Sequence, residues 1–346
     1  MINRENKKQF DIGLAVLRVI LCFLVIVHHY YNYFYSTIEW GKIIIKLEYF
    51  SFQVRTFFII SFYFSYKTFI SFNFKKIYQR FERLLIPYIL WPIIFWLINN
   101  LLIKISNKNL NLNHTFYYLK YQLLFGNIFI QSFWFQWVLI FITFIFTLIF
   151  FVFKKNYIFV LLLLEITSFI FQYNGINHKN FSNYDNTKMY SFGRIIEMIP
   201  NAIAGFVIAF YGVIDILRKN NYKTIILCLY AIYFILNFKI FESIRGFDFC
   251  GIRLYLMSIC LFITFTMFPS EKIKNKTILK FIKQITNHTA GIYYTHDSIY
   301  NILKNYNDSM KYKTIEGCIY IYLICYFINF IGSKLLKKTK LRHLFE

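Results

Sequence analysis

The sequence has 346 residues, of which 58% are hydrophobic and 23% aromatic, and its formal net charge is +23. Only 16% of the residues are charged, whereas a soluble domain carries about a quarter. Apolar runs of about 18 or more residues recur along the chain, which excludes an ordinary soluble protein and indicates an all-α, polytopic membrane protein.

The basic residues are distributed as in the cytoplasmic loops of a membrane protein. Lys and Arg gather in short clusters between the apolar runs, which is the positive-inside pattern and argues against nucleic acid as a partner. These clusters lie at 74–83, 153–155, 218–223, 271–283 and 334–343.

We expect about ten transmembrane helices in a single domain over residues 1–346, with no soluble domain. An N-terminus in the cytoplasm puts every basic cluster on the inner side, and an even number of spans returns the C-terminus to the cytoplasm. The sequence therefore predicts a multi-pass protein of the inner (plasma) membrane. The expected spans are roughly 12–36, 51–72, 84–105, 133–153, 157–173, 192–214, 222–240, 250–269, 286–304 and 315–334.

Three smaller features narrow the prediction. The first span is too long for a signal peptide, so we expect it to remain in the mature protein. The six cysteines lie in or beside apolar segments without a C-x-x-C pair, so no metal site or disulfide framework is indicated. The stretch TFYYLKYQLLF (115–125) is amphipathic and is expected at the membrane surface.

The first span carries ionisable residues, in the stretch LRVILCFLVIVHH. Arg18 and His29 are eleven residues apart, about three helical turns, so they share one face at about 16 Å along the axis, while His28 points about 100° away. A buried arginine costs at least about 2.5 kcal/mol, so this pair suggests function. The structural alternative is that Arg18 snorkels to the headgroups and His29 makes a core hydrogen bond.

Several motifs, taken in order, resemble those of the acyltransferase-3 family of membrane acyltransferases. Arg18 and His29 match its arginine, ten residues, histidine signature. The chain departs from the family pattern at Ala15, where many members have aspartate, and at Phe62, where the second-span motif has glycine. The other matching stretches are VRTFFIISFYFS (54–65), Arg80-x-x-Arg83 followed by Pro87-Tyr88, FWFQWVLIF (133–141) and the late G-I-Y-x-x-H element with Gly291, Tyr293 and His296.

The resemblance implies transfer of an acyl group, often acetyl, from cytoplasmic acyl-CoA to a hydroxyl or amine. The acceptor in many members is a cell-surface polysaccharide or its lipid-linked precursor, and a surface glycan is the acceptor we expect. The chain is thus expected to be an O-acetyltransferase-like enzyme that uses acetyl-CoA or another acyl-CoA as donor and holds no permanently bound cofactor.

The charged residues of the matching motifs suit this chemistry. Arg80 and Arg83, three apart, are expected to contact the phosphates of CoA, because guanidinium binds phosphate through two hydrogen bonds. The alternative for both is simple topogenic charge. Arg18 is expected to hold the pantetheine or the thioester carbonyl.

The histidines are the candidate proton acceptors. An imidazole, with an ordinary pKa of about 6.5, is largely neutral at physiological pH, so His29 is the expected general base. A covalent acyl-histidine is also compatible, and His28 is the competing candidate. His296 either completes the site or is a packing residue. Glu197 either orients an imidazole or acceptor hydroxyl, or simply pairs with Arg194 at i,i+3.

Two rival functions remain open at this point. A lipid-linked oligosaccharide flippase or polymerase also has many apolar spans, but a polymerase usually has a large outer loop, and the longest outer connection here runs only from 106 to 132. An enzyme of the unrelated membrane O-acyltransferase superfamily also uses an intramembrane histidine, but well into the chain rather than in the first span.

Overall fold

The described part of the chain is helical. The computed structural model describes residues 11–31, 52–105, 112–126, 133–176, 187–219, 225–226, 229, 251–268, 275–306 and 315–345. No strand occurs among them, so the all-α prediction is confirmed for this part of the chain. The α-helices are α1 (Ile12–Tyr31), α3 (Phe52–Ile70), α4 (Phe74–Ile105), α5 (Leu112–Phe125), α6 (Trp134–Val152), α7 (Tyr157–Tyr173), α8 (Thr187–Phe210), α9 (Val213–Lys219), α12 (Ile252–Thr266), α13 (Lys276–Asn287), α14 (Thr289–Tyr306) and α15 (Ile315–Leu335).

Nine of the ten predicted spans coincide with helices in the described ranges. The seventh predicted span, 222–240, lies outside the described ranges apart from residues 225, 226 and 229. Five of the described helices are long and apolar enough to cross a membrane, and α7 and α12 are shorter apolar helices. The count of ten and the orientation of the termini remain predictions. The five apolar segments are Ile12–His29, Phe74–Leu101, Trp134–Val152, Tyr190–Phe210 and Glu316–Leu335.

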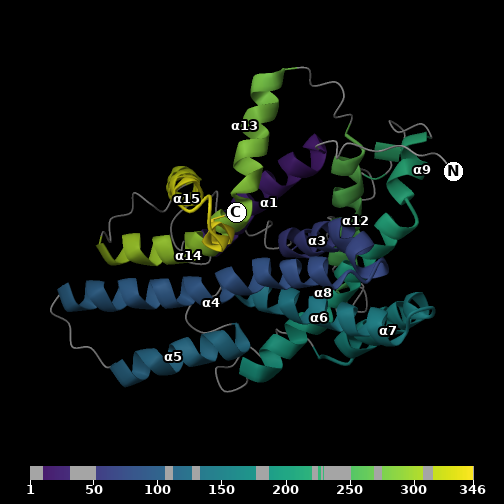
Figure 1. The fold of residues 1–346 in the computed structure, drawn as a ribbon, viewed down its shortest axis with the longest axis horizontal. Helices are drawn as coiled ribbons and strands as arrows, with labels where there is room; N and C mark the ends of the chain where they lie inside the picture. Colours follow the sequence, from purple (N-terminus) through teal and green to yellow (C-terminus); the bar gives the residue numbers. More distant parts are fainter. Residues whose placement is uncertain are drawn as a thin grey trace.

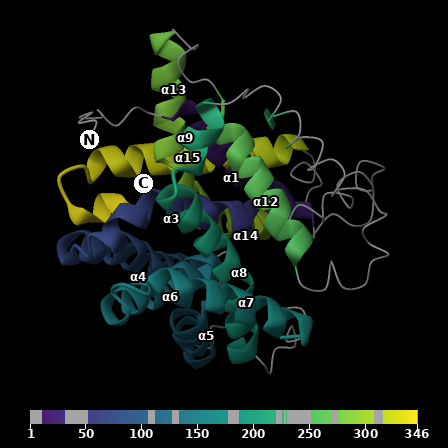
Figure 2. The ribbon, with the colours of Figure 1, turned by 90° about the vertical axis from the view of Figure 1, so that its right-hand side faces the viewer.

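Helix α3 is the centre of the bundle, where it packs against α1, α6, α8 and α12 (Figure 2). Its approach to α8 requires a glycine, because a Cβ at Gly205 would lie 2.2 Å from the carbonyl oxygen of Ile59. Gly13 likewise allows α1 to approach α12, since a Cβ at this position would lie 1.8 Å from the carbonyl oxygen of Phe265. Small residues at such crossings let helix backbones pack closely in membrane proteins.

Aromatic side chains fill the space between α3, α6 and α8. Phe62 stacks with Phe69 at 5.8 Å between ring centroids and meets Phe146 at 4.5 Å. Phe146 in turn lies 6.1 Å from Phe206 of α8. These rings are fully buried, so three helices far apart in the sequence are held by one aromatic core.

Helix α5, which contains the predicted amphipathic stretch, is docked on the bundle. The last carbonyls of a helix have no partner within it. Those of residues 122–125 accept hydrogen bonds from Tyr88 of α4, Trp137 of α6 and Ser191 of α8, at 2.7–3.0 Å. The end of α5 is therefore fixed by side chains from three neighbours.

The C-terminal segment folds back onto the bundle after α15. Its 3-10 helix, Lys340–Leu344, brings the Leu344 carbonyl to the indole N–H of Trp91 at 2.9 Å. The next carbonyl, of Phe345, accepts a hydrogen bond from Nδ1 of His288 at 2.9 Å. His288 lies between α13, which projects from the bundle, and α14, which runs beside α4 (Figure 1). The segment therefore fixes the start of α14.

Candidate active site

The first residue of the predicted site, Arg18, faces α14. Its Nη2 donates a hydrogen bond to Oγ1 of Thr289 at 3.0 Å. The Thr289 hydroxyl donates to the carbonyl of Thr286 at 2.9 Å, and the thiol of Cys22 donates to the Thr289 carbonyl at 3.4 Å. Arg18 is therefore held at the start of α14 by a neutral hydroxyl, and no carboxylate of the described residues forms an ion pair with it.

His29 meets His296 about three turns after Arg18 on α1 and about two turns after Thr289 on α14. The two ring centroids lie 5.2 Å apart at an interplanar angle of 53°. The contacts of Arg18 with Thr289 and of His29 with His296 occur in the same order along α1 and α14. The two helices therefore run in the same direction, as expected of the first and ninth spans, and Arg18 and His29 do lie on one face of α1.

The hydrogen bonding of His296 fixes which of its nitrogens carries the proton. The ring is fully buried, and its Nδ1 lies 2.6 Å from the carbonyl oxygen of Tyr293. A carbonyl only accepts hydrogen bonds, so Nδ1 is the donor, and in the neutral ring Nε2 carries the lone pair. Among the described residues this Nε2 has no hydrogen-bond partner. The half-buried His29 thus lies against a histidine that presents an unprotonated nitrogen.

An aromatic wall borders the histidine pair. Tyr293 lies 5.6 Å from His296, and its ring meets Phe135 of α6 at 5.0 Å and Phe57 of α3 at 6.4 Å. These rings come from three helices, so they give the pair an apolar surround that excludes water from one side.

Glu197 lies in α8 between two arginines. Its Oε2 is 3.7 Å from Nη1 of Arg194 and 4.0 Å from Nη2 of Arg55, and both Glu197 and Arg55 are almost fully buried. Arg194 stacks on Trp134 at 4.2 Å, and the ring beside Trp134 on α6, that of Phe135, meets Tyr293 at 5.0 Å. The structure therefore brings His29, His296 and the cluster around Glu197 into one region, which α1, α3, α8 and α14 share.

The two arginines of the R-x-x-R element have different surroundings. Nε of Arg80 donates to the hydroxyl of Thr143 at 3.2 Å and Nη2 to that of Ser61 at 2.9 Å, while Nη1 donates to Ser65. Arg83 is exposed. The structure therefore places Arg80 inside the bundle and does not bring the two guanidinium groups to a common set of partners.

Phe62, one of the two departures from the family pattern, lies directly under Arg80. The Cζ of Arg80 is 5.0 Å from the centroid of the Phe62 ring and 5.8 Å from that of Phe69. The other departure, Ala15, is buried, and its carbonyl oxygen lies 3.3 Å from the hydroxyl of Thr286, which donates to it. A phenylalanine thus provides a cation–π surface for Arg80 where the family motif has glycine.

Sequence reasoning missed Arg55 and Thr289 as parts of this region. Arg55 lies inside the predicted second span, and an ionisable residue in a span is a functional signal that was available. Thr289 carries no comparable signal, because a threonine within an apolar stretch is common. Its contact with Arg18 joins residues 271 positions apart in the chain.

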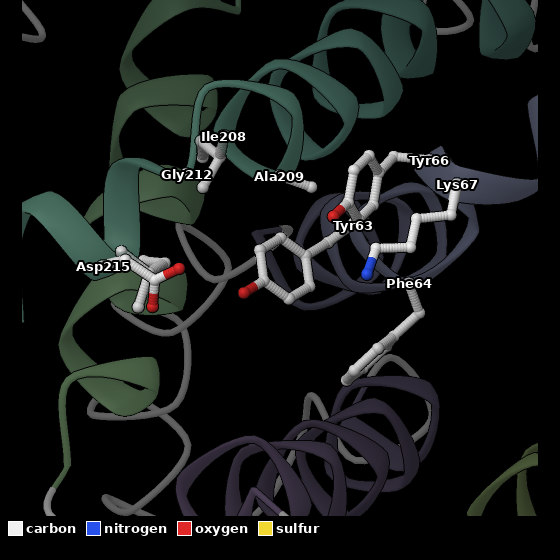
Figure 3. Close-up of a pocket in the computed structure, with 9 residues that line it drawn as sticks. Tyr63, Phe64, Tyr66, Lys67, Ile208, Ala209, Gly212 and Asp215 are labelled. Atoms are coloured by element: carbon white, nitrogen blue, oxygen red, sulfur yellow. The ribbon is translucent and has the colours of Figure 1, made fainter. Parts of the chain in front are cut away.

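A cavity of about 240 Å³ lies away from these residues, between α3 and the junction of α8 with α9. Figure 3 shows Asp215 and Lys67 on opposite sides of Tyr63 within it. No residue of the predicted site lines this cavity. In the ranges that the structure describes, no group of three or more His, Cys, Asp or Glu is arranged to hold a metal ion.

Comparison with known proteins identifies a family. The acyltransferase domain that defines the acyltransferase-3 family matches residues 11–341. No curated protein and no solved structure matches the chain. The matched range includes every residue of the candidate site, from Arg18 to His296. Since the match covers nearly the whole chain, the protein belongs to the acyltransferase-3 family and is a membrane acyltransferase.

Proposed function

We propose that this membrane acyltransferase moves an acetyl group from cytoplasmic acetyl-CoA to a hydroxyl of a cell-surface glycan or its lipid-linked precursor, at the plasma membrane. The observation that carries the proposal is the contact of α1 with α14, which places Arg18 and the pair of His29 and His296 on one wall. The contact thereby aligns Arg18, a cation for the acyl donor, with His29, a base for the hydroxyl that receives the acyl group.

His29 is the general base of the proposed reaction. It takes the proton of the acceptor hydroxyl while the oxygen attacks the thioester carbonyl, forming the new C–O bond of the ester. The C–S bond of the thioester then breaks, and the proton passes to the departing thiolate, giving CoA with a free thiol. A positioned base of this kind typically contributes about 10²–10⁴-fold in rate.

His296 has a supporting role at the same step. Its Nδ1 is engaged by the Tyr293 carbonyl, so its Nε2 is an acceptor of hydrogen bonds in the neutral ring. Such an acceptor orients either the ring of His29 or the acceptor hydroxyl. Glu197, in the same region, holds the guanidinium groups of Arg55 and Arg194 through its carboxylate.

The donor is held by the arginines. Arg80 contacts only hydroxyls and aromatic rings among the described residues, and none of their carboxylates forms an ion pair with it. A partly buried cation with neutral partners attracts an anion, and hydroxyl groups rotate to donate to a phosphate as readily as they accept from arginine. We assign Arg80 to the phosphates of CoA, with the exposed Arg83 adding attraction at longer range. Arg18 stabilises the negative charge on the thioester oxygen.

The test compares the surface glycans of cells that carry the chain with those of cells that lack it. Mass spectrometry should find glycan species heavier by one acetyl group only in the cells that carry the chain. Identical glycan masses in both would contradict the glycan acceptor, and a different added acyl mass would replace acetyl as the transferred group.

A further inference from the structure

The cluster of Arg55, Glu197 and Arg194 has two positive charges and one negative charge. The two distances to the Glu197 carboxylate, 4.0 Å from Arg55 and 3.7 Å from Arg194, are longer than hydrogen bonds. One carboxylate is therefore shared between two guanidinium groups, and the three side chains together carry a net charge of +1. Net charge in a desolvated site is costly, so the cluster favours binding of a further anion.

The two arginines differ in how far they are enclosed. The backbone at Gly251, at the start of α12, covers Arg55. A Cβ at Gly251 would lie 3.2 Å from Nη2 of Arg55 and 2.8 Å from Oε1 of Gln172. Gly251 has a φ of +63°, which glycine adopts without strain. The side chain of Arg55 is 7% exposed and that of Arg194 is 17% exposed. Arg55 is thus the inner counter-ion of Glu197, and Arg194 is the arginine that a ligand reaches.

Arg194 is held in a fixed orientation. Its Cζ lies 4.2 Å from the ring centroid of Trp134 and 5.2 Å from that of Tyr190, and both Nε and Nη2 donate to the Tyr190 hydroxyl, at 3.2 and 2.8 Å. A guanidinium stacked on aromatic rings loses little further freedom when it binds a carboxylate or phosphate. This preorganisation is what a recognition residue needs, and a surface ion pair does not need it.

Arg194 also lies close to the reacting groups. Its guanidinium lies over the ring of Trp134. The next residue on α6, Phe135, meets Tyr293 at 5.0 Å, and Tyr293 lies 5.6 Å from His296. An anionic group bound by Arg194 would therefore belong to the same molecule that presents its hydroxyl to His29, or to the sugar next to it in a glycan.

We propose that Arg194 binds an anionic group, a carboxylate or a phosphate, on or next to the sugar that receives the acyl group. This inference rests on the proposed function, whose acceptor it restricts to an acidic glycan. It differs from a plain ion pair between Arg194 and Glu197, because the single carboxylate of Glu197 faces the positive charges of both Arg55 and Arg194.

The test uses three forms of one acceptor, the surface glycan extracted from cells that lack the chain. The first is untreated, the second has its carboxyl groups reduced to alcohols, and the third has its phosphates removed. Purified protein in lipid vesicles is supplied with radiolabelled acetyl-CoA, and kcat/KM for each glycan is measured. Loss of activity on the second form identifies a carboxylate, and loss on the third form a phosphate.

We expect kcat/KM to fall at least about tenfold on the form that lacks the anion. A tenfold change corresponds to about 1.4 kcal/mol, and a charge-assisted hydrogen bond contributes more than that. On untreated glycan, the Arg194→Gln variant should have the same lowered kcat/KM, mainly because its KM is higher. Its kcat/KM should not fall further on the form that lacks the anion. Arg194→Lys should recover part of the loss. Arg218→Gln, which removes an exposed arginine elsewhere, should behave like the unaltered protein.

Three results would overturn the inference. Equal transfer to all three forms would exclude recognition of an anion while leaving the glycan acceptor in place. A variant Arg194→Gln that remains as sensitive to removal of the anion as the unaltered protein would assign the recognition to another residue. No transfer to any form, including the untreated glycan, would contradict the proposed function itself.

Discussion

Arg80 and Arg194 are both arginines within the helical bundle, but their partners differ in kind. Arg80 donates to three hydroxyls and lies over Phe62 and Phe69. Arg194 shares the carboxylate of Glu197 with Arg55. The difference shows two ways to keep a guanidinium ready for an anion: one surrounds it with neutral groups that reorient, and the other makes it share one carboxylate with a second arginine.

The comparison predicts that the two regions respond differently when a partner is removed. Glu197 is the only acidic partner described for both Arg55 and Arg194, whereas Arg80 has several neutral partners. Removing the carboxylate leaves two positive charges facing each other, while removing one hydroxyl leaves the others in place. The effects should therefore be unequal in size.

The largest expected effect is that of Glu197→Gln. Breaking a buried ion pair by removing one partner costs about 3–5 kcal/mol, because a buried charge is left uncompensated. Thermal unfolding of the purified protein in detergent should show a large fall in midpoint. Adding Arg55→Met to the same variant should recover much of it, and a double variant no more stable than the single one would argue against charge imbalance as the cause.

The next effect is on the donor. Arg80→Lys keeps the charge but loses the planar pair of donors that matches a phosphate, so KM for acetyl-CoA should rise at least about tenfold. Arg83→Lys makes the same chemical change at an exposed position and should alter KM by less than about twofold. Steady-state kinetics with purified protein measure both values. A larger effect at Arg83 would move the phosphate contact to that residue.

The sequence predicted the shared face of α1 because helical geometry is local. Eleven residues are about three turns whatever the surrounding fold, and the structure places Arg18 and His29 on that face. The assignment of α14 as the neighbouring helix could come only from the motif resemblance. The contact of Arg55 with the Glu197 carbonyl joins residues 142 positions apart, and no periodicity in either segment indicates which helices pack together.

The pairing of Arg80 with Arg83 shows the limit of such local reasoning. Residues three apart lie about 60° from each other around a helix, which is close enough to suggest a common ligand. On α4 this angle separates the interior, where α3 and α6 supply Ser61, Ser65 and Thr143, from the exposed side. The direction of the core around a helix depends on its neighbours, which the local sequence does not specify.

A smaller effect is expected for Ser65→Ala. The serine hydroxyl accepts from Arg80 and donates to the Ser61 carbonyl at 2.7 Å. Loss of one such hydrogen bond costs about 1 kcal/mol, and the hydroxyls of Ser61 and Thr143 still accept from the guanidinium. The same thermal unfolding measurement should give a fall well below that of Glu197→Gln. Equal falls would mean that Arg80 depends on its hydroxyls as strongly as Arg194 depends on its carboxylate.

The smallest effect concerns a charged pair at the edge of the bundle, Asp11 with Arg218 at 3.5 Å. Burial raises the pKa of the Asp11 carboxyl above its ordinary value, more than Leu14 and Arg218 lower it. The pKa of Asp11 is therefore higher in the folded protein than in the unfolded chain. Its protonated carboxyl contributes stability that is fully present below pH about 4 and is lost as pH rises through the folded pKa.

Asp11→Asn should therefore flatten the dependence of stability on pH by less than about 1 kcal/mol, since a half-exposed pair is screened by solvent. Asparagine still accepts the hydrogen bond that the backbone N–H of Leu14 donates to Asp11 at 3.1 Å. Unfolding midpoints across the acidic range measure the change, and an unaltered pH profile would exclude Asp11 as its source.

The central claim is that His29, placed against His296 on the wall that α1 shares with α14, accepts the proton of the acceptor. The most direct measurement compares acyl transfer by His29→Ala and His28→Ala, with gel filtration and unfolding curves showing that both variants are intact. We predict that His29→Ala lowers kcat by about 10²–10⁴-fold and that His28→Ala stays within a few-fold of the unaltered protein. Full transfer by an intact His29→Ala protein, or a loss confined to His28→Ala, would contradict the claim.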